Sequence, residues 1–298
     1  MQEYYFLFVL ALIWVVFATL QDLKKREVAD WLTYSLIIFA LVYRAFYSIF
    51  LKDAMFFVYG LLGFVAFFFL AHAFYYGRVF AGGDAKLLMG LGAVIPGGSL
   101  NELSINLVFF LFLLFFLGAF YSLTFSFWVV YKRYDSFKKE FLKKIEKVKS
   151  SVLVLFIIYV GLLATAAADN FFKFFSYQFS LYFRLSFYLI PFIVFFIILF
   201  IYFKALEEGC LIRKMSPWNL SEGDWLERDI KIGKRWIRKS VHGLSIEEIK
   251  LLRKAKKKAL IREGIPFVPA FLLAFLVMLF VFFVLKSRPE EIFLFLSG

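Results

Sequence analysis

Residues 105–131, INLVFFLFLLFFLGAFYSLTFSFWVVY, form an apolar stretch without a single charged side chain. A helix rises about 1.5 Å per residue, so about 20 apolar residues cross a hydrocarbon core of roughly 30 Å. The stretch is long enough to do so. The composition agrees, because 63% of the 298 residues are hydrophobic and 22% are aromatic. The sequence therefore predicts a protein that lies in a bilayer.

Similar apolar runs recur along the chain and predict an all-α fold, a polytopic bundle of about eight transmembrane helices. The runs lie near residues 4–20, 32–50, 54–76, 105–131, 151–168, 182–203 and 267–285, with a shorter one near 85–96. The first run lacks the basic start and the small-residue cleavage site of a removable signal peptide. We therefore interpret it as the first span.

Lys and Arg are concentrated between alternate spans. Segment 21–31 holds three of them, 77–84 one, 132–150 eight and 204–266 sixteen, out of 35 in the chain. Because basic residues favour the cytoplasmic side, this predicts a multi-pass protein of the plasma membrane with its N-terminus outside and these four segments inside. The two long basic segments would face an anionic leaflet, so we expect membrane lipids, and not nucleic acid, as their partners.

The supply of metal ligands is small. The chain has one cysteine, Cys210, and two histidines, His72 and His242, which excludes a disulfide framework and a Cys-rich zinc module. We expect neither a metal ion nor another cofactor.

Two aspartates at predicted helix ends are the candidate catalytic residues, Asp22 after the first span and Asp84 at the start of the short one. A charged group near hydrocarbon is expensive and persists mainly where it has a function or a partner. From Asp84 to Pro96 a helix would measure about 20 Å, too short to cross the core. Either Asp84 is recessed below the cytoplasmic surface, or the outer loop at residues 96–99 dips inward. Gly82 and Gly83 favour a water-filled cavity with Asp84 on its wall.

Two carboxyl groups in one wet cavity can share a proton, so that one activates water while the other polarises a carbonyl. This is peptide hydrolysis without a metal ion or a covalent intermediate. A simpler interpretation stays open, in which Asp84 caps its helix and Asp22 pairs with Lys25 or Arg26. Lys86 is expected either to tune the aspartate pair and position substrate, or to extend toward lipid headgroups. Asp30 is expected to cap the second span.

Three stretches resemble the type IV prepilin peptidase and preflagellin (archaellin) peptidase family, membrane aspartyl proteases of the Gly-x-Gly-Asp type, and are most similar to its archaeal branch. They are Asp22 to Trp31, with Arg26-Glu27-Val28-Ala29-Asp30; Gly82-Gly83-Asp84-Ala85-Lys86-Leu87-Leu88; and, near the C-terminus, Glu222 to Leu226, Gly243 to Ile249 and Arg262 to Pro269. Ala81 stands where the family has its first glycine. Val28-Ala29-Asp30 replaces the bacterial Ile-Pro-Asn.

The resemblance implies that Asp22 and Asp84 are the catalytic pair of an aspartic-type endopeptidase. It implies that the partners are prepilin-like or preflagellin precursors, cut after a short basic leader at the cytoplasmic face. The cysteine-containing insertion of many bacterial members is missing, so neither zinc nor N-methyltransferase activity is expected. Two alternatives remain: an intramembrane protease of the signal peptide peptidase and presenilin group, and a cation- or proton-coupled transporter that uses Asp84.

The predicted organisation has four parts. Residues 1–131 form the catalytic transmembrane region with both aspartates, and 132–203 a basic cytoplasmic loop with two further spans. Residues 204–266 form a small, basic, helical cytoplasmic element, in which Ser245 and Glu248 predict a capping box at a helix start. Residues 267–298 form the last span and an outer tail.

Overall fold

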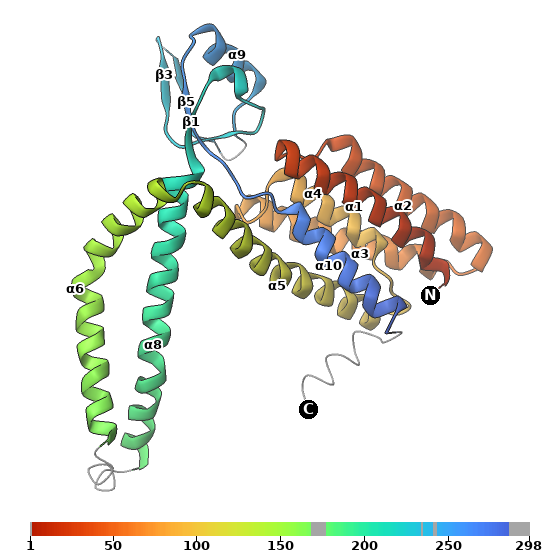
Figure 1. Cartoon of the computed structure of the whole chain (residues 1–298). Helices are drawn as coiled ribbons and strands as arrows, with labels where there is room; N and C mark the ends of the chain where they lie inside the picture. Colours follow the sequence, from red (N-terminus) through yellow and green to blue (C-terminus); the bar gives the residue numbers. More distant parts are fainter. Residues whose placement is uncertain (1, 168–176, 234, 241–242, 286–298) are drawn as a thin grey trace. The chain divides into compact units, whose positions relative to one another are not determined.

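The computed structural model describes residues 2–167, 177–233, 235–240 and 243–285, and this part of the chain is mostly helical (Figure 1). The helices are α1 (Tyr5–Lys25), α2 (Asp30–Leu51), α3 (Met55–Tyr76), α4 (Gly82–Val94), α5 (Leu100–Lys132), α6 (Tyr134–Ala167), α8 (Tyr177–Leu206), α9 (Ile246–Lys254) and α10 (Val268–Phe283), with the short turns η1 (Gln2–Tyr4), η2 (Glu207–Leu211) and η3 (Pro217–Asn219). The strands are β1 (Ile212–Met215), β2 (Trp225–Leu226), β3 (Ile230–Ile232), β4 (Arg235–Ile237) and β5 (Ala259–Arg262). The chain divides into two compact units, Met1–Phe125 with Gly264–Gly298, and Ser126–Glu263.

The predicted helical, multi-pass membrane architecture is confirmed, with fewer full spans than expected. In the described part of the chain, five helical segments are long and apolar enough to cross a membrane: Tyr5–Lys25, Asp30–Leu51, Met55–Tyr76, Leu100–Lys132 and Leu189–Leu211. The predicted last span corresponds to α10, which is apolar but has only 16 residues. The predicted outer tail beyond residue 285 lies outside the described residues.

The prediction of a loop at residues 132–150 is wrong. Helix α6 includes most of this basic segment and continues into the apolar stretch that follows. Lys and Glu are good helix formers, so a charged segment continues an apolar helix without a break. The predicted span 151–168 is therefore the second half of one long helix, and its last residue lies outside the described part.

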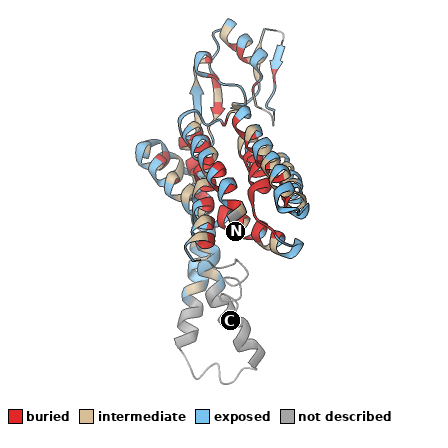
Figure 2. Cartoon of the chain, turned by 90° about the vertical axis from the view of Figure 1, so that its right-hand side faces the viewer, coloured by how far each residue is buried: buried red, intermediate tan, exposed pale blue. Residues whose placement is uncertain are grey.

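In the first unit the short helix α4 packs against α1, α2 and α3, and α10 packs along α1. Figure 2 shows the buried residues gathered along the facing sides of these helices. Aromatic side chains make up much of this core, and Phe67, Phe110, Phe271 and Phe275 are almost completely buried. Helix α4 is buried along nearly its whole length, from Asp84 to Val94. The core thus encloses the helix that carries one of the candidate aspartates.

Two glycines bring α3 and α4 into backbone contact. A Cβ atom built at Gly92 would lie 2.5 Å from the carbonyl oxygen of Gly63, and one built at Gly63 would lie 2.3 Å from the carbonyl oxygen of Gly92. Both distances are far below van der Waals contact, and both obstacles are backbone atoms that cannot rotate away. Only glycine fits at these two positions, as is typical of closely packed membrane helices.

We expect Gly92→Ala to destabilise the protein, because the added methyl group forces α3 and α4 apart. Overpacking of this kind costs about 1–3 kcal/mol, which should lower the melting temperature in detergent by about 3–10 °C. The control is Gly264→Ala, since Gly264 has no heavy atom within 4 Å of an added Cβ. Equal melting temperatures for the two variants would show that the helices tolerate the extra methyl group.

Arg44 joins α2 to the C-terminal end of α4. Its guanidinium group is fully buried and donates four hydrogen bonds to backbone carbonyls: Nε to Ala93 at 2.7 Å, Nη1 to Phe56 at 2.9 Å, and Nη2 to Val94 at 3.2 Å and Ile95 at 2.8 Å. The last carbonyls of a helix have no partner within it. Arg44 supplies partners at the end of α4. It also lies over the rings of Tyr4 and Phe56, at 5.2 and 5.0 Å.

The second unit contains the helix pair α6 and α8 and a small domain with its own core. This domain is only partly helical, so the expected helical element at 204–266 is corrected. Strands β1, β5 and β2 form an antiparallel sheet in the order β1-β5-β2, and β3 pairs with β4. The strands have two to four residues, too few for the alternating pattern that predicts a strand. The capping box is confirmed: the Ser245 hydroxyl accepts from the Glu248 amide, and the Glu248 carboxylate accepts from the Ser245 amide.

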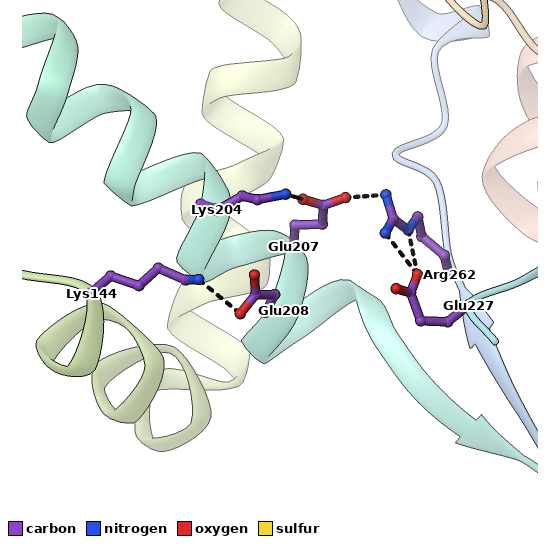
Figure 3. Close-up of polar contacts among 6 residues, drawn as sticks. All are labelled: Lys144, Lys204, Glu207, Glu208, Glu227 and Arg262. Atoms are coloured by element: carbon purple, nitrogen blue, oxygen red, sulfur yellow. Dashed lines mark hydrogen bonds and ion pairs between the residues drawn. The ribbon is translucent and has the colours of Figure 1, made fainter. Parts of the chain in front are cut away.

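Charged side chains connect the small domain to the end of α8 (Figure 3). Arg262 of β5 donates to Glu207 of η2 and, through Nη2 and Nε, to one carboxylate oxygen of Glu227 at 2.7 and 2.9 Å. Glu207 also accepts from Lys204 at 2.9 Å, and Lys144 of α6 pairs with Glu208 at 2.7 Å. Several partly exposed ion pairs that form a network contribute more to stability than an isolated pair does. This network connects β5, the central strand of the three-stranded sheet, to the end of α8.

Candidate functional site

Asp22 lies in the last turn of α1 and is almost fully buried, with 6% of its surface exposed. Helix α1 ends at Lys25. The next residue, Arg26, has the left-handed conformation, and its amide donates to the Asp22 carbonyl at 2.7 Å. The Asp22 carboxylate Oδ2 accepts a hydrogen bond from the Val268 amide at 2.9 Å. Arg26 also lies within electrostatic reach of this carboxylate.

The partner of Asp22 is the N-terminus of α10, which begins at Val268. The first amides of a helix have no carbonyl partner within it, and the helix dipole places partial positive charge there. The amide of Phe267 faces the same carboxylate. These amides offset part of the cost of burying a negative charge at Asp22.

Asp84 is the third residue of α4 and is buried as well, with 8% of its surface exposed. Its carboxylate Oδ2 accepts a hydrogen bond from the Ala81 amide at 3.2 Å, just ahead of the helix. The capping contact that the simpler interpretation expected is therefore present. The carboxyl groups of Asp84 and Asp22 also interact electrostatically. Both expected catalytic residues thus lie in one site within the first unit.

Gly83 allows the start of α4 to approach the turn between α1 and α2. A Cβ atom at Gly83 would lie 3.1 Å from the Cβ of Val28, tighter than an ordinary contact. Gly82 differs, since its added Cβ would lie 3.8 Å from the Tyr75 ring. The close approach at Gly83 draws Asp84 toward the end of α1. A role of either glycine in shaping the site for substrate stays a prediction.

Lys86 links α4 to the start of α2. Its ammonium Nζ lies 2.5 Å from the Asp30 carboxylate and 5.3 Å from the centre of the Tyr34 ring. Asp30 is the first residue of α2, while Ala29 occupies the capping position without a side-chain hydrogen bond. The expected cap by Asp30 is therefore wrong, since its carboxylate pairs with Lys86. A direct role of Lys86 toward the aspartate pair stays a prediction.

Two groups near Asp22 were not among the expected site residues. One is the amide of Val268, which lies in a stretch that carries the family resemblance, and the other is Tyr121 of α5, which interacts electrostatically with Asp22. The apolar run after Pro266 indicates a helix start with free amides, but it does not indicate which acidic side chain accepts hydrogen bonds from them.

Among the residues that the structure describes, no three His, Cys, Asp or Glu side chains gather in a way that could hold a metal ion.

Comparison with known proteins agrees with this site. Residues 9–123, which include both aspartates, match the type IV leader peptidase family. Over 89 residues the chain is 38% identical to the preflagellin peptidase of Methanocaldococcus jannaschii and 30% identical to that of Methanococcus maripaludis. The expected resemblance is confirmed for this segment.

These alignments cover 30% of this chain, and the chain spans 38% of the length of each relative. No solved structure matches the chain. The family match, at residues 9–123, lies within the first unit and holds the aspartate pair.

Proposed function

We propose that this protein is a membrane aspartic endopeptidase that removes the leader of preflagellin-like or prepilin-like precursors. The observation that carries the proposal is the burial of Asp22 and Asp84 in one electrostatically coupled site. Two buried carboxyl groups at helix ends, each with a backbone amide partner, are costly unless they are used. The similarity to two preflagellin peptidases, each over 89 residues, supports the choice of substrate.

We further propose that the protein lies in the plasma membrane with its N-terminus outside and the site toward the cytoplasm. The strongly basic segments 132–150 and 204–266 support this orientation, as does their suitability for anionic lipid headgroups. In this arrangement residues 1–131 form the catalytic region, and 204–266 a domain beside the cytoplasmic leaflet. A cleavage point between a basic leader and an apolar helix would lie at the same membrane boundary.

The surroundings of the two aspartates support different roles for them. Asp22 accepts hydrogen bonds from amides at the N-terminus of α10, which favour ionisation of Asp22 over that of Asp84, so we assign Asp22 as the general base. Asp84 has one longer amide contact in a buried setting, so we assign it as the protonated general acid. Of the alternatives, a transporter is less well supported, because the buried charged group of Arg44 bonds to backbone carbonyls.

The proposed reaction proceeds in two steps. Asp22 takes a proton from water while the water oxygen bonds to the scissile carbonyl carbon, and Asp84 gives its proton to the carbonyl oxygen. The resulting gem-diol then collapses: one hydroxyl proton returns to Asp84, the carbon–nitrogen bond breaks, and Asp22 passes its proton to the leaving amine. Both carboxyl groups end as they began, and the mechanism forms no covalent intermediate with the enzyme.

The test is processing of a co-expressed preflagellin-like precursor in membranes, followed by mass spectrometry of both fragments. We expect the wild-type chain to release one leader peptide and the doubly substituted Asp22→Asn, Asp84→Asn chain to release none. Asp53→Asn is the matched control, since Asp53 is exposed in the α2–α3 connection and should leave processing unchanged. Absence of cleavage by the wild type, or cleavage by the double variant at the same bond, would refute the proposal.

A further inference from the structure

The hydroxyl oxygen of Tyr121 is buried without a hydrogen-bond partner, which distinguishes it among the described side chains. Leaving such a group unpaired costs about 1–3 kcal/mol, so an unpaired hydroxyl inside a native protein calls for an explanation. The chain uses Phe at 45 positions, many of them in its apolar helices, and Phe would fill this position without that cost. The hydroxyl itself is therefore the feature to explain.

Tyr121 lies on the side of α5 that faces the start of α10. Gly118 is one helical turn earlier, and residues three apart share a helix face. A Cβ atom at Gly118 would lie 2.7 Å from the Phe267 ring and 3.4 Å from the Cβ of Ala270. Tyr121 also packs against the core cluster that contains α10.

The same neighbourhood contains the Asp22 carboxylate. The amide of Val268, next in sequence to Phe267, donates to Asp22, and Tyr121 interacts electrostatically with Asp22. Asp22 thus has a donor from α10 on its Oδ2 atom and a free hydroxyl from α5 nearby. A phenol hydroxyl is a neutral group that can both donate and accept a hydrogen bond.

We propose that Tyr121 is a positioning residue that holds the hydrolytic water against Asp22. The phenol O–H donates to the water oxygen, the water donates one proton to Asp22, and a lone pair on the water remains to attack the scissile carbonyl. The hydroxyl keeps its proton throughout, so the proton transfers between water, Asp22 and Asp84 are unchanged. This inference rests on the proposed peptidase function, because it assigns a role within that reaction.

The experiment compares Tyr121→Phe with the wild type in the full-length protein, using a precursor-derived peptide in detergent. Loss of one hydrogen bond to the reacting water should lower kcat about tenfold to a hundredfold and leave KM within about twofold. The melting temperature should stay equal or rise, since an unpaired buried hydroxyl is removed. Tyr47→Phe is the control. Tyr47 stacks on Tyr43 near the C-terminal end of α2, so this substitution should leave kcat unchanged.

The outcomes separate this inference from the function on which it rests. Wild-type activity together with an unchanged kcat in Tyr121→Phe would overturn the role of the tyrosine and leave the peptidase intact. A fall in melting temperature that accounts for the lost activity would overturn it as well, because the hydroxyl would then be structural. Failure of the wild type itself to cleave would overturn the proposed function first.

Discussion

Asp84→Asn is expected to lower the rate of precursor cleavage by at least about a thousandfold while the protein still folds and inserts. An amide has no acidic proton to give to the scissile carbonyl, and loss of a general acid from an aspartate pair removes most of the catalysis. The fold should survive, because the amide oxygen can still accept from Ala81 as the carboxylate does. Single-turnover cleavage in membranes, normalised to inserted protein, measures the effect.

Asp22→Asn should be equally inactive, because an amide cannot take the proton of water. Here the stability differs with the substitution chosen. In Asp22→Asn the side-chain oxygen can still accept the Val268 amide, whereas Asp22→Ala leaves that buried amide unpaired at a cost of about 1–3 kcal/mol. Melting temperatures should therefore fall in the order wild type, Asp22→Asn, Asp22→Ala. Substantial cleavage by either Asn variant would mean that the pair serves as helix caps only.

Arg44→Met is expected to have the largest effect on stability. Methionine fills much of the same volume but donates no hydrogen bond, so four backbone carbonyls lose a partner at once, three of them at the end of α4. Breaking a buried, charged hydrogen-bonded group in this way costs roughly 3–5 kcal/mol, and the melting temperature should fall by more than about 10 °C. Cleavage activity should fall too, because α4 carries Asp84.

Lys52→Met provides the control for Arg44→Met, since Lys52 lies exposed just beyond the end of the same helix. Circular dichroism at 222 nm in detergent follows both melts. A loss of less than about 1 kcal/mol on Arg44→Met would show that water or neighbouring groups satisfy those carbonyls instead.

Much of the first unit is predictable from the sequence, because membrane helices show in the chain as long apolar runs. Four of the predicted spans correspond to α1, α2, α3 and α5, and the short run from Asp84 corresponds to α4. The position of both aspartates at helix ends follows from the same pattern. Hydropathy determines where a span lies and how long it is, and these properties need no knowledge of the neighbouring helices.

The contacts that complete the site are not predictable in this way. Asp22 and Val268 are 246 residues apart, and nothing in the spacing of either indicates the other. Arg44 looks like an ordinary basic residue in an apolar run, although it is buried on the carbonyls of α4. Ion pairs mislead similarly: Asp30 resembles a helix cap but binds Lys86. Each contact depends on the three-dimensional packing of separate segments, which a linear pattern does not contain.

The hydrogen bond from Val268 to Asp22 also determines when the site can form during synthesis. A ribosome adds about 10 residues per second, so roughly 20 seconds separate the translation of Asp84 from that of Val268. Throughout this interval the growing chain holds both carboxyl groups but lacks the helix that orients one of them. A chain released early by a premature stop would have the same defect. The site is therefore incomplete until Val268 has been translated, and we expect copies that stop before this residue to be inactive.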